Sequence, residues 1–255
     1  MSLIETRNLI ISIGGKQICR NLNFQMAAGE CWGVLGTNGI GKTTLLHTLA
    51  GLRLPDRGEI LVENTLIATH HRKQLARKIG VLFQDSQDTF PSTVLEAVLA
   101  GRFPHIPFWA SESENDIRVA RQALKDVGMD TMQTRLVNTL SGGERRRLAL
   151  ATLLTQSPLV YLMDEPANHL DLHYQIVMLE MVLQRVASGE GAIMMVLHDI
   201  NLLMRFCTHA MLIIDDTRIL CGTVNDVVNT DNLEQVYRHP VNHIVAEDRT
   251  YYFPG

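Results

Sequence analysis

A glycine-rich stretch in the first fifth of the chain has the residue types that bind a polyphosphate. It reads Gly36-Thr37-Asn38-Gly39-Ile40-Gly41-Lys42-Thr43, with two glycines followed by a lysine and a hydroxyl residue. Glycine lets the backbone turn its N–H groups inward, the lysine would reach the β- and γ-phosphates, and the threonine hydroxyl would complete a Mg²⁺ shell. A glycine turn without a ligand is the alternative, but it requires neither the lysine nor the threonine. The stretch, extended to Thr44, therefore predicts a nucleoside triphosphate site.

Two acidic residues follow a continuously apolar run at residues 159–163. Asp164 is placed to hold the hydration shell of a magnesium ion. Glu165 is placed to accept a proton from the attacking water, or to orient that water. Paired acids after a strand can simply form a turn. An abrupt Asp-Glu pair after five apolar residues is better explained by a metal and a nucleotide nearby.

Polar residues also end two other apolar runs, at residues 79–83 and 192–197. Gln84 follows the first run, and its amide oxygen could bind Mg²⁺ or the attacking water. His198 follows the second, and it could hydrogen-bond a γ-phosphate oxygen or hold the glutamate and water in line. Ligands of open parallel sheets lie beyond the carboxyl ends of the strands, where these residues would be. Each could instead be an ordinary strand-end residue.

A second anion site is indicated by Leu140-Ser141-Gly142-Gly143-Glu144. Ser141 and Glu144 form a capping box that opens a helix through about Thr155. The two glycines leave backbone N–H groups uncovered at the helix N-terminus, which suits an anion. The alternative is a well-capped helix that carries its three arginines, residues 145–147, on a solvated side.

The elements that must position these residues predict an α/β fold. Residues 3–13, 22–26 and 59–62 favour an antiparallel β-layer beside a parallel core. The pattern turns helical at residues 93–156, which predicts an inserted helical subdomain. Residues 1–92 and 157–222 then form the nucleotide-binding core with its β-subdomain. Residues 223–255 are predicted to be a short helical tail. The core, the inserted subdomain and the tail together make the whole chain, residues 1–255, a single predicted domain.

Composition narrows the classes of partner. The chain has 255 residues, of which 46% are hydrophobic and 20% charged, and its net charge of −4 gives no support for nucleic acid as a partner. Four scattered cysteines without a CxxC pair predict inert thiols in a reducing compartment. We find neither a signal peptide nor a run of about 18 apolar residues that would span a membrane. A membrane would be reached through a partner.

With these pieces in order, residues 3–222 resemble the ATP-binding-cassette (ABC) ATPases. Residues 36–44 look like the Walker A motif, Gln84 like the Q-loop glutamine, and LSGGE like the signature. Residues 159–165 look like Walker B, residues 168–171 like the D-loop, and His198 like the switch histidine. The resemblance implies a P-loop NTPase fold with a RecA-like, mostly parallel sheet, and ATP and Mg²⁺ as cofactors. It also implies an ATP-bound, head-to-tail homodimer in which each ATP lies between Walker A of one copy and the signature of the other.

Within that family, three stretches are similar to the ATPases of iron-siderophore, haem and cobalamin importers. They are residues 93–98 followed by 101–105, residues 197–202 and residues 233–237. This likeness implies a peripheral subunit on the cytoplasmic face of the cell membrane. It would bind integral membrane permease subunits and, through them, a substrate-binding protein.

Three residues depart from the family pattern. Ile13 stands where an aromatic usually stacks on adenine, Ile40 replaces a small residue, and Glu144 replaces glutamine. Glu165 and His198 are intact, so we expect hydrolysis. The alternatives are a non-transport ABC ATPase acting on ribosomes or DNA, an ABC ATPase for another small-molecule cargo, and a nucleotide sensor without turnover.

Overall fold

The computed structural model describes residues 2–84, 91–168, 170–247 and 249–255. Its centre is a six-stranded sheet with the order β10-β9-β3-β8-β7-β6. The strands are β3 (Cys31–Gly36), β6 (Ile79–Leu82), β7 (Val160–Met163), β8 (Ala192–Val196), β9 (His209–Ile213) and β10 (Ile219–Thr223). All neighbouring pairs are parallel except β9 and β10. The carboxyl ends of β3, β6, β7 and β8 therefore meet at one edge.

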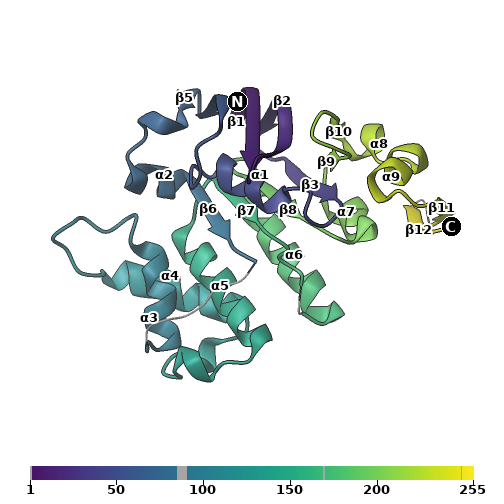
Figure 1. Cartoon of the computed structure of the whole chain (residues 1–255). Helices are drawn as coiled ribbons and strands as arrows, with labels where there is room; N and C mark the ends of the chain where they lie inside the picture. Colours follow the sequence, from purple (N-terminus) through teal and green to yellow (C-terminus); the bar gives the residue numbers. More distant parts are fainter. Residues whose placement is uncertain (1, 85–90, 169, 248) are drawn as a thin grey trace.

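Both faces of this sheet are covered, which explains the continuous apolar runs. Along β8, Ile193 and Met195 pack in the cluster that contains α6 (Leu172–Val186), while Met194 and Val196 pack in the cluster that contains α1 (Lys42–Leu49). Successive residues of a strand point to opposite faces, so each strand contributes to both cores. In Figure 1 the sheet lies between the β1–β2 ribbons on one side and α6 on the other.

The expected antiparallel layer is present as a four-stranded sheet with the order β2-β1-β4-β5. Its strands are β1 (Ser2–Ile13), β2 (Lys16–Ala27), β4 (Arg57–Val62) and β5 (Thr65–Leu66). The strand β2 begins six residues earlier than position 22, where we expected it. Gly14 and Gly15, with φ of 55° and 81°, complete the turn in two residues, so pairing resumes at once.

Residues 93–156 form the expected helical group, which lies apart from the antiparallel sheet in Figure 1. Its helices are α3 (Val94–Leu99), α4 (Glu114–Asp126) and α5 (Gly142–Gln156), with short 3₁₀ turns at Ala100–Arg102, Asp130–Met132 and Val137–Thr139. Capping boxes at Thr93, Ser113 and Ser141 open the three helices. Small and branched side chains from all three helices fill the space between them, including Val98, Ala123 and Ala151.

The C-terminal segment corrects the prediction of a helical tail. Two short helices are present, α8 (Val224–Val227) and α9 (Thr230–Tyr237), but a β-hairpin of β11 (Val241–Ala246) and β12 (Arg249–Pro254) follows them. The hairpin sequences are rich in β-branched and aromatic residues, which favour strands. The remaining helices are α2 (Arg72–Lys78), α7 (Ile200–Phe206) and a 3₁₀ turn at Ile67–Thr69. Within the described residues, no helix combines the length and apolar character needed to cross a bilayer.

Candidate functional site

The glycine-rich stretch forms a loop between the end of β3 and the first residue of α1. Gly39 and Gly41 have φ of 73° and 109°, in the left-handed region that side chains other than glycine rarely adopt. A Cβ atom at Gly41 would also lie 2.1 Å from the side chain of Ile18, so size as well as backbone angle requires glycine there. No side chain caps the N-terminus of α1. Its first N–H groups are therefore placed to bind an anion.

Lys42 is buried at the base of this loop, with 6% of its surface exposed. Its Nζ donates hydrogen bonds to the carbonyl oxygens of Gly36, at 2.8 Å, and Thr37, at 3.1 Å. Burial lowers the pKa of the ammonium group, while the charges of Glu165 and Asp164 oppose that effect. The lysine therefore holds the loop in a curved shape and keeps a cation beside the acidic pair.

Asp164 carries a carboxylate that is fully buried at the end of β7. Neither of its oxygens reaches hydrogen-bond geometry with a donor among the described residues. Burial raises the pKa of this carboxyl, and the nearby Thr43 hydroxyl favours the charged form and opposes the rise. A buried carboxylate without a partner is costly. One such carboxylate beside a hydroxyl fits Mg²⁺, which takes one or two protein ligands together with phosphate oxygens.

Glu165 is the residue at which the separate motifs meet. Its Oε2 accepts hydrogen bonds from the amide groups of Gln84, at 2.9 Å, and Asn168. Its Oε1 lies 2.6 Å from Nε2 of His198. The backbone of Glu165 is left-handed, with φ of 48°. The ends of β6, β7 and β8 thus converge on one carboxylate.

Asn168 was not predicted as a site residue individually, although it lies in the stretch that resembles the D-loop. Its amide fixes the same Glu165 oxygen that Gln84 contacts. The position three residues after Glu165 is the signal that could have identified it, since Asn168 N–H also bonds the Glu165 carbonyl in a tight turn, at 3.1 Å. His169, another residue of that stretch, lies outside the described residues.

The alternative interpretation, in which residues 145–147 lie on a solvated side, is wrong for Arg146, which is only 8% exposed. Its guanidinium donates hydrogen bonds to backbone carbonyls at the ends of β6 and β7, including those of Asp164 and Glu165, both at 2.7 Å. The signal was present in the sequence. Arg146 shares a helix face with Leu150 and Leu153, four and seven residues later, and both of those leucines are buried.

The start of α5 has the predicted capping box. Ser141 N–H donates to the Glu144 carboxylate at 2.7 Å, and Glu144 N–H donates to Ser141 Oγ at 3.3 Å. The Ser141 backbone hydrogen bond and an ion pair with Arg135, at 2.8 Å, lower the pKa of Glu144. The extra negative charge is thereby partly balanced. A Cβ atom at Gly142 would meet nothing within 4 Å, so this glycine leaves space that the chain itself does not fill.

The side chains of the signature residues Ser141 and Glu144 bond to different partners from those of the other motifs. Within the described part of the chain, the hydrogen bonds of the Ser141 and Glu144 side chains join these two residues to each other and to Arg135, and none reaches the phosphate loop. One copy of the chain therefore brings together Lys42, Asp164 and the cluster around Glu165, but does not join them to the helix start at Ser141.

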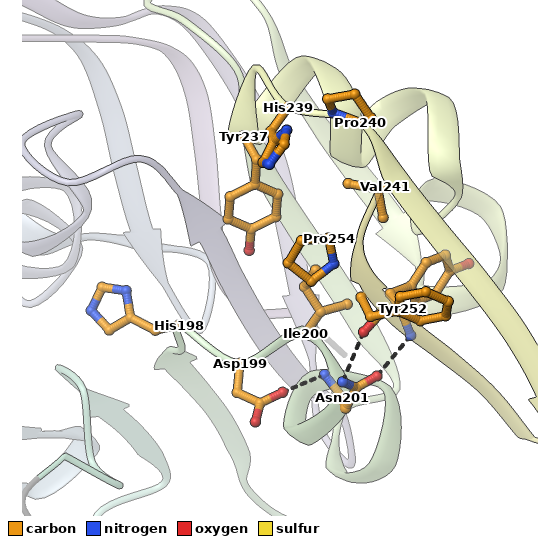
Figure 2. A pocket seen from close by; sticks show the side chains of 11 residues that line it. His198, Asp199, Ile200, Asn201, Tyr237, His239, Pro240, Val241, Tyr252 and Pro254 are labelled. Carbon is orange, nitrogen blue, oxygen red and sulfur yellow. Dashed lines mark hydrogen bonds between the residues drawn. The ribbon is translucent and has the colours of Figure 1, made fainter.

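Behind the histidine, the C-terminal hairpin contacts α7 and lines a pocket (Figure 2). Asp199 caps α7 through the N–H groups of Asn201 and Leu202. Asn201 in turn pairs with the backbone of β12, since its Oδ1 accepts from Tyr252 N–H at 2.9 Å and its Nδ2 donates to Tyr252 O at 3.1 Å. In Figure 2 the imidazole of His198 points away from the tail residues. The hairpin therefore supports the helix that begins two residues after the histidine.

Comparisons with known proteins decide the family. A family model described as ABC transporter matches residues 19–168. A petrobactin import ATP-binding protein, FpuD of Bacillus anthracis, is 36% identical over 235 residues, which cover 92% of this chain and 86% of that protein. The chain belongs to the ABC transporter family. The hemin import ATP-binding protein HmuV of Gloeobacter violaceus is also similar, with 33% identity over 93% of this chain and 90% of the relative.

Solved structures agree with this ABC assignment. A transporter assigned to the metal-chelate type, in an inward-facing conformation, superposes with a TM-score of 0.86 at 26% identity and covers 100% of this chain and 98% of that one. The ATP-binding cassette MJ1267 in its ADP conformation has a TM-score of 0.79 at 21% identity over 93% of this chain and 99% of that one, which shows a shared fold. The predicted family, fold class and ATPase activity are confirmed.

The departures from the ABC pattern have clear places in the structure. Ile13 ends β1 with 47% of its surface exposed, so it remains available to contact a base. Ile40 packs its side chain against the cluster between the two sheets. The larger residue in the phosphate loop therefore fills space inside the protein rather than the anion site.

Proposed function

We propose that this ABC ATPase powers a membrane importer whose cargo is a metal chelate, namely siderophore iron, haem or cobalamin. The observation that carries the hydrolytic part is the Glu165 carboxylate, which Gln84, Asn168 and His198 hold from three directions. The relatives named for petrobactin and hemin import, and the metal-chelate type neighbour, support the cargo class.

In this proposal, different residues bind the phosphates of ATP and activate the attacking water. The loop of residues 36–44 binds the phosphates through its N–H groups and Lys42. Glu165 takes the proton of the attacking water, or orients that water, and His198 keeps the carboxylate and the water in line with the γ-phosphate. Both residues act at the edge where the strands end, so a nucleotide on the loop presents its terminal phosphate to them.

Magnesium fits the same edge. Thr43 and Asp164 would hold Mg²⁺, with the Gln84 amide oxygen as a further ligand to the ion or to the water. When bound, Mg²⁺ neutralises the charge on the β- and γ-phosphates. The unpartnered oxygens of Asp164 support this assignment, because they are buried where a cation would satisfy them.

The isolated signature suggests how the site is completed. Ser141, Gly142, Gly143 and Glu144 would bind the ATP of a second copy in a head-to-tail homodimer, since uncovered N–H groups at a helix N-terminus suit an anion. Splitting the γ-phosphate removes charge and contacts that hold the copies together. The subunit would act at the cytoplasmic face of the membrane, bound to permease subunits and indirectly to a substrate-binding protein, without nucleic acid.

The Glu165→Gln variant tests the catalytic assignment. The amide keeps the size of the side chain but cannot accept the proton, so we expect ATP binding with little turnover and a stable ATP-bound dimer. Size-exclusion chromatography with light scattering, with and without Mg-ATP, measures the dimer. A variant that stays monomeric with Mg-ATP, or hydrolyses at the wild-type rate, contradicts the proposal.

The cargo is tested on the purified complex with its permease. Phosphate release is measured while the matching substrate-binding protein is loaded with an iron siderophore, haem or cobalamin in turn. We expect one chelate to raise the rate above that of the empty binding protein. Stimulation by an unrelated solute only would assign the ATPase to another small-molecule importer, and absence of phosphate release altogether would favour a nucleotide sensor.

A further inference from the structure

Arg146 lies in the second turn of α5 and contacts two backbone segments that the mechanism uses. Nη1 donates to the carbonyl oxygens of Phe83 and Gln84, the latter at 3.2 Å, just beyond β6. Nη2 donates to Asp164 O and Glu165 O, both at 2.7 Å, at the end of β7. Nε donates to Pro166 O at 3.3 Å. One buried guanidinium therefore binds five backbone carbonyls, two just beyond β6 and three at the end of β7.

These carbonyls belong to the residues whose side chains meet above them. Gln84 Nε2 donates to Glu165 Oε2 at 2.9 Å, so the two residues are joined once through their side chains and again through Arg146. Beyond the end of a strand, a backbone carbonyl has no neighbouring strand whose N–H group could donate a hydrogen bond to it. A guanidinium offers five N–H donors in one plane, which matches a set of carbonyls around it.

The same helix carries the signature at its N-terminus. Ser141 precedes Arg146 by five residues, a rise of about 7.5 Å along one helix. The intervening residues are continuous helix, with the N–H of Arg145 bonded to Ser141 O at 2.9 Å. A displacement of the helix start is therefore transmitted to the guanidinium as a rigid-body movement, and from there to the backbone of Gln84 and Glu165.

We propose that Arg146 is a positioning residue that couples the two ATP sites of the dimer. This inference rests on the proposed function, in which Ser141 of each copy binds the ATP of the other copy. Closure of that site moves α5, and Arg146 then sets the backbone of Gln84 and Glu165 in its own copy. Nucleotide binding at one site thereby prepares the catalytic glutamate of the other site.

The test compares Arg146→Lys with Arg147→Lys in the complex with the permease. Lysine keeps the charge but has three donors on a point-like group, so it cannot span both strand ends. Arg147 is the matched control, since its guanidinium lies 4.9 Å from the centre of the Tyr174 ring and contacts the carbonyls of Val127 and Gly128, at 3.4 and 3.3 Å. It belongs to the same helix but not to the strand-end cluster.

The readouts are the ATP dependence of phosphate release and the ATP affinity of the isolated subunit. For Arg146→Lys we expect a fall in kcat of about 10- to 100-fold, as for a misplaced catalytic group, with a Hill coefficient near 1. Nucleotide affinity of the isolated subunit stays within about twofold of wild type, because the phosphate loop is untouched. Arg147→Lys keeps the wild-type kcat and Hill coefficient. Unchanged kcat and cooperativity in Arg146→Lys overturn the inference, as do equal losses in both variants.

A second variant tests whether Arg146 must be attached to α5 or only has to fill the cavity between the strand ends. In Arg146→Ala, guanidinium ion at low millimolar concentration can occupy the cavity and bind the freed carbonyls, but it is not attached to α5. We expect it to raise the melting temperature of the variant without restoring cooperativity. Recovery of both shows that Arg146 only fills the cavity. If the wild-type complex itself releases no phosphate, the proposed function is wrong, and the inference about Arg146 is wrong with it. If the wild-type complex is active and only the result for Arg146→Lys differs from expectation, the inference alone is wrong.

Discussion

Nε2 of His198 lies 2.6 Å from Oε1 of Glu165, and these residues come from the ends of two adjacent parallel strands. The side chain of His198 is 41% exposed and that of Glu165 12%, so the imidazole covers the carboxylate from the open side. Gln84 and Asn168 hold the other oxygen. Both oxygens of the proposed base are thus engaged, and the exposed imidazole leaves the histidine contact open to an incoming phosphate.

Replacing the histidine tests this arrangement. In His198→Ala the glutamate keeps its contacts with Gln84 and Asn168 but loses the group that we propose aligns it with the γ-phosphate. We expect kcat to fall by about 100-fold or more, the usual contribution of a positioned acid–base partner, while ATP affinity is retained. Single-turnover phosphate release on the permease complex measures the step. His70→Ala, directly after the 3₁₀ turn at Ile67–Thr69, is the control, and an equal loss there would contradict a specific role for His198.

Lys42 gives a prediction about binding instead of turnover. Lys42→Ala removes the ammonium that contacts Gly36 O and Thr37 O and would reach the phosphates. We expect ATP affinity to fall about 100-fold or more, equivalent to the loss of one or two charge-assisted hydrogen bonds. Titration calorimetry with Mg-ATP measures the change. Lys16→Ala, at the exposed first residue of β2, serves as the control, and retained affinity in Lys42→Ala would refute the phosphate-loop assignment.

The sequence sufficed for features in which local pattern and chemistry agree. Residues 36–44 and the Asp164–Glu165 pair each follow a short apolar strand. Because such strands are parallel, their carboxyl ends meet at one edge, which places Gln84, Glu165 and His198 together. The capping box at Ser141 is likewise a matter of three residues' spacing.

Features that depend on distant partners escaped prediction. Arg146 stands among three arginines, and its buried position depends on carbonyls more than 15 residues away along the chain, those of Gln84 and Glu165. The hairpin of β11 and β12 is β-prone in sequence, but its attachment depends on Asn201, about 50 residues earlier. The order of strands in the central sheet also arises from long-range pairing, which no local motif encodes.

The stability of the helical group at low pH should depend on whether the Asp116 carboxyl is charged. Its carboxylate accepts hydrogen bonds from Ser113 Oγ, at 2.6 Å, and Arg102 Nε, at 2.7 Å. The Ser113 hydroxyl, then Arg102, hold the pKa of Asp116 at about 2, below its ordinary value of 3.8. A lowered pKa in the folded state means that the stabilisation is complete above about pH 4 and disappears as the pH falls through about 2.

We therefore expect Asp116→Asn to lower the free energy of unfolding at pH 7 by about 1 to 2 kcal/mol, the range for charge-assisted hydrogen bonds near a surface. The difference from wild type should shrink between pH 4 and pH 2. Urea denaturation at several pH values measures both quantities. Asp130→Asn, an exposed position, changes the charge equally and is the control. A difference that does not vary over this pH range would contradict the assignment to Asp116.

The hairpin should protect the helix that follows His198. In Asn201→Ala the two hydrogen bonds to Tyr252 are lost, and the backbone N–H and carbonyl of Tyr252 are left without their partner. We expect faster amide hydrogen exchange in β12 and at the start of α7, since each lost bond costs about 1 kcal/mol locally. Exchange measured by mass spectrometry on the full chain gives the change by segment. Val245→Ala, on the exposed hairpin surface, should leave α7 as in wild type. If α7 exchanges equally in both variants, Asn201 does not connect the hairpin to the histidine, and the tail is independent of the site.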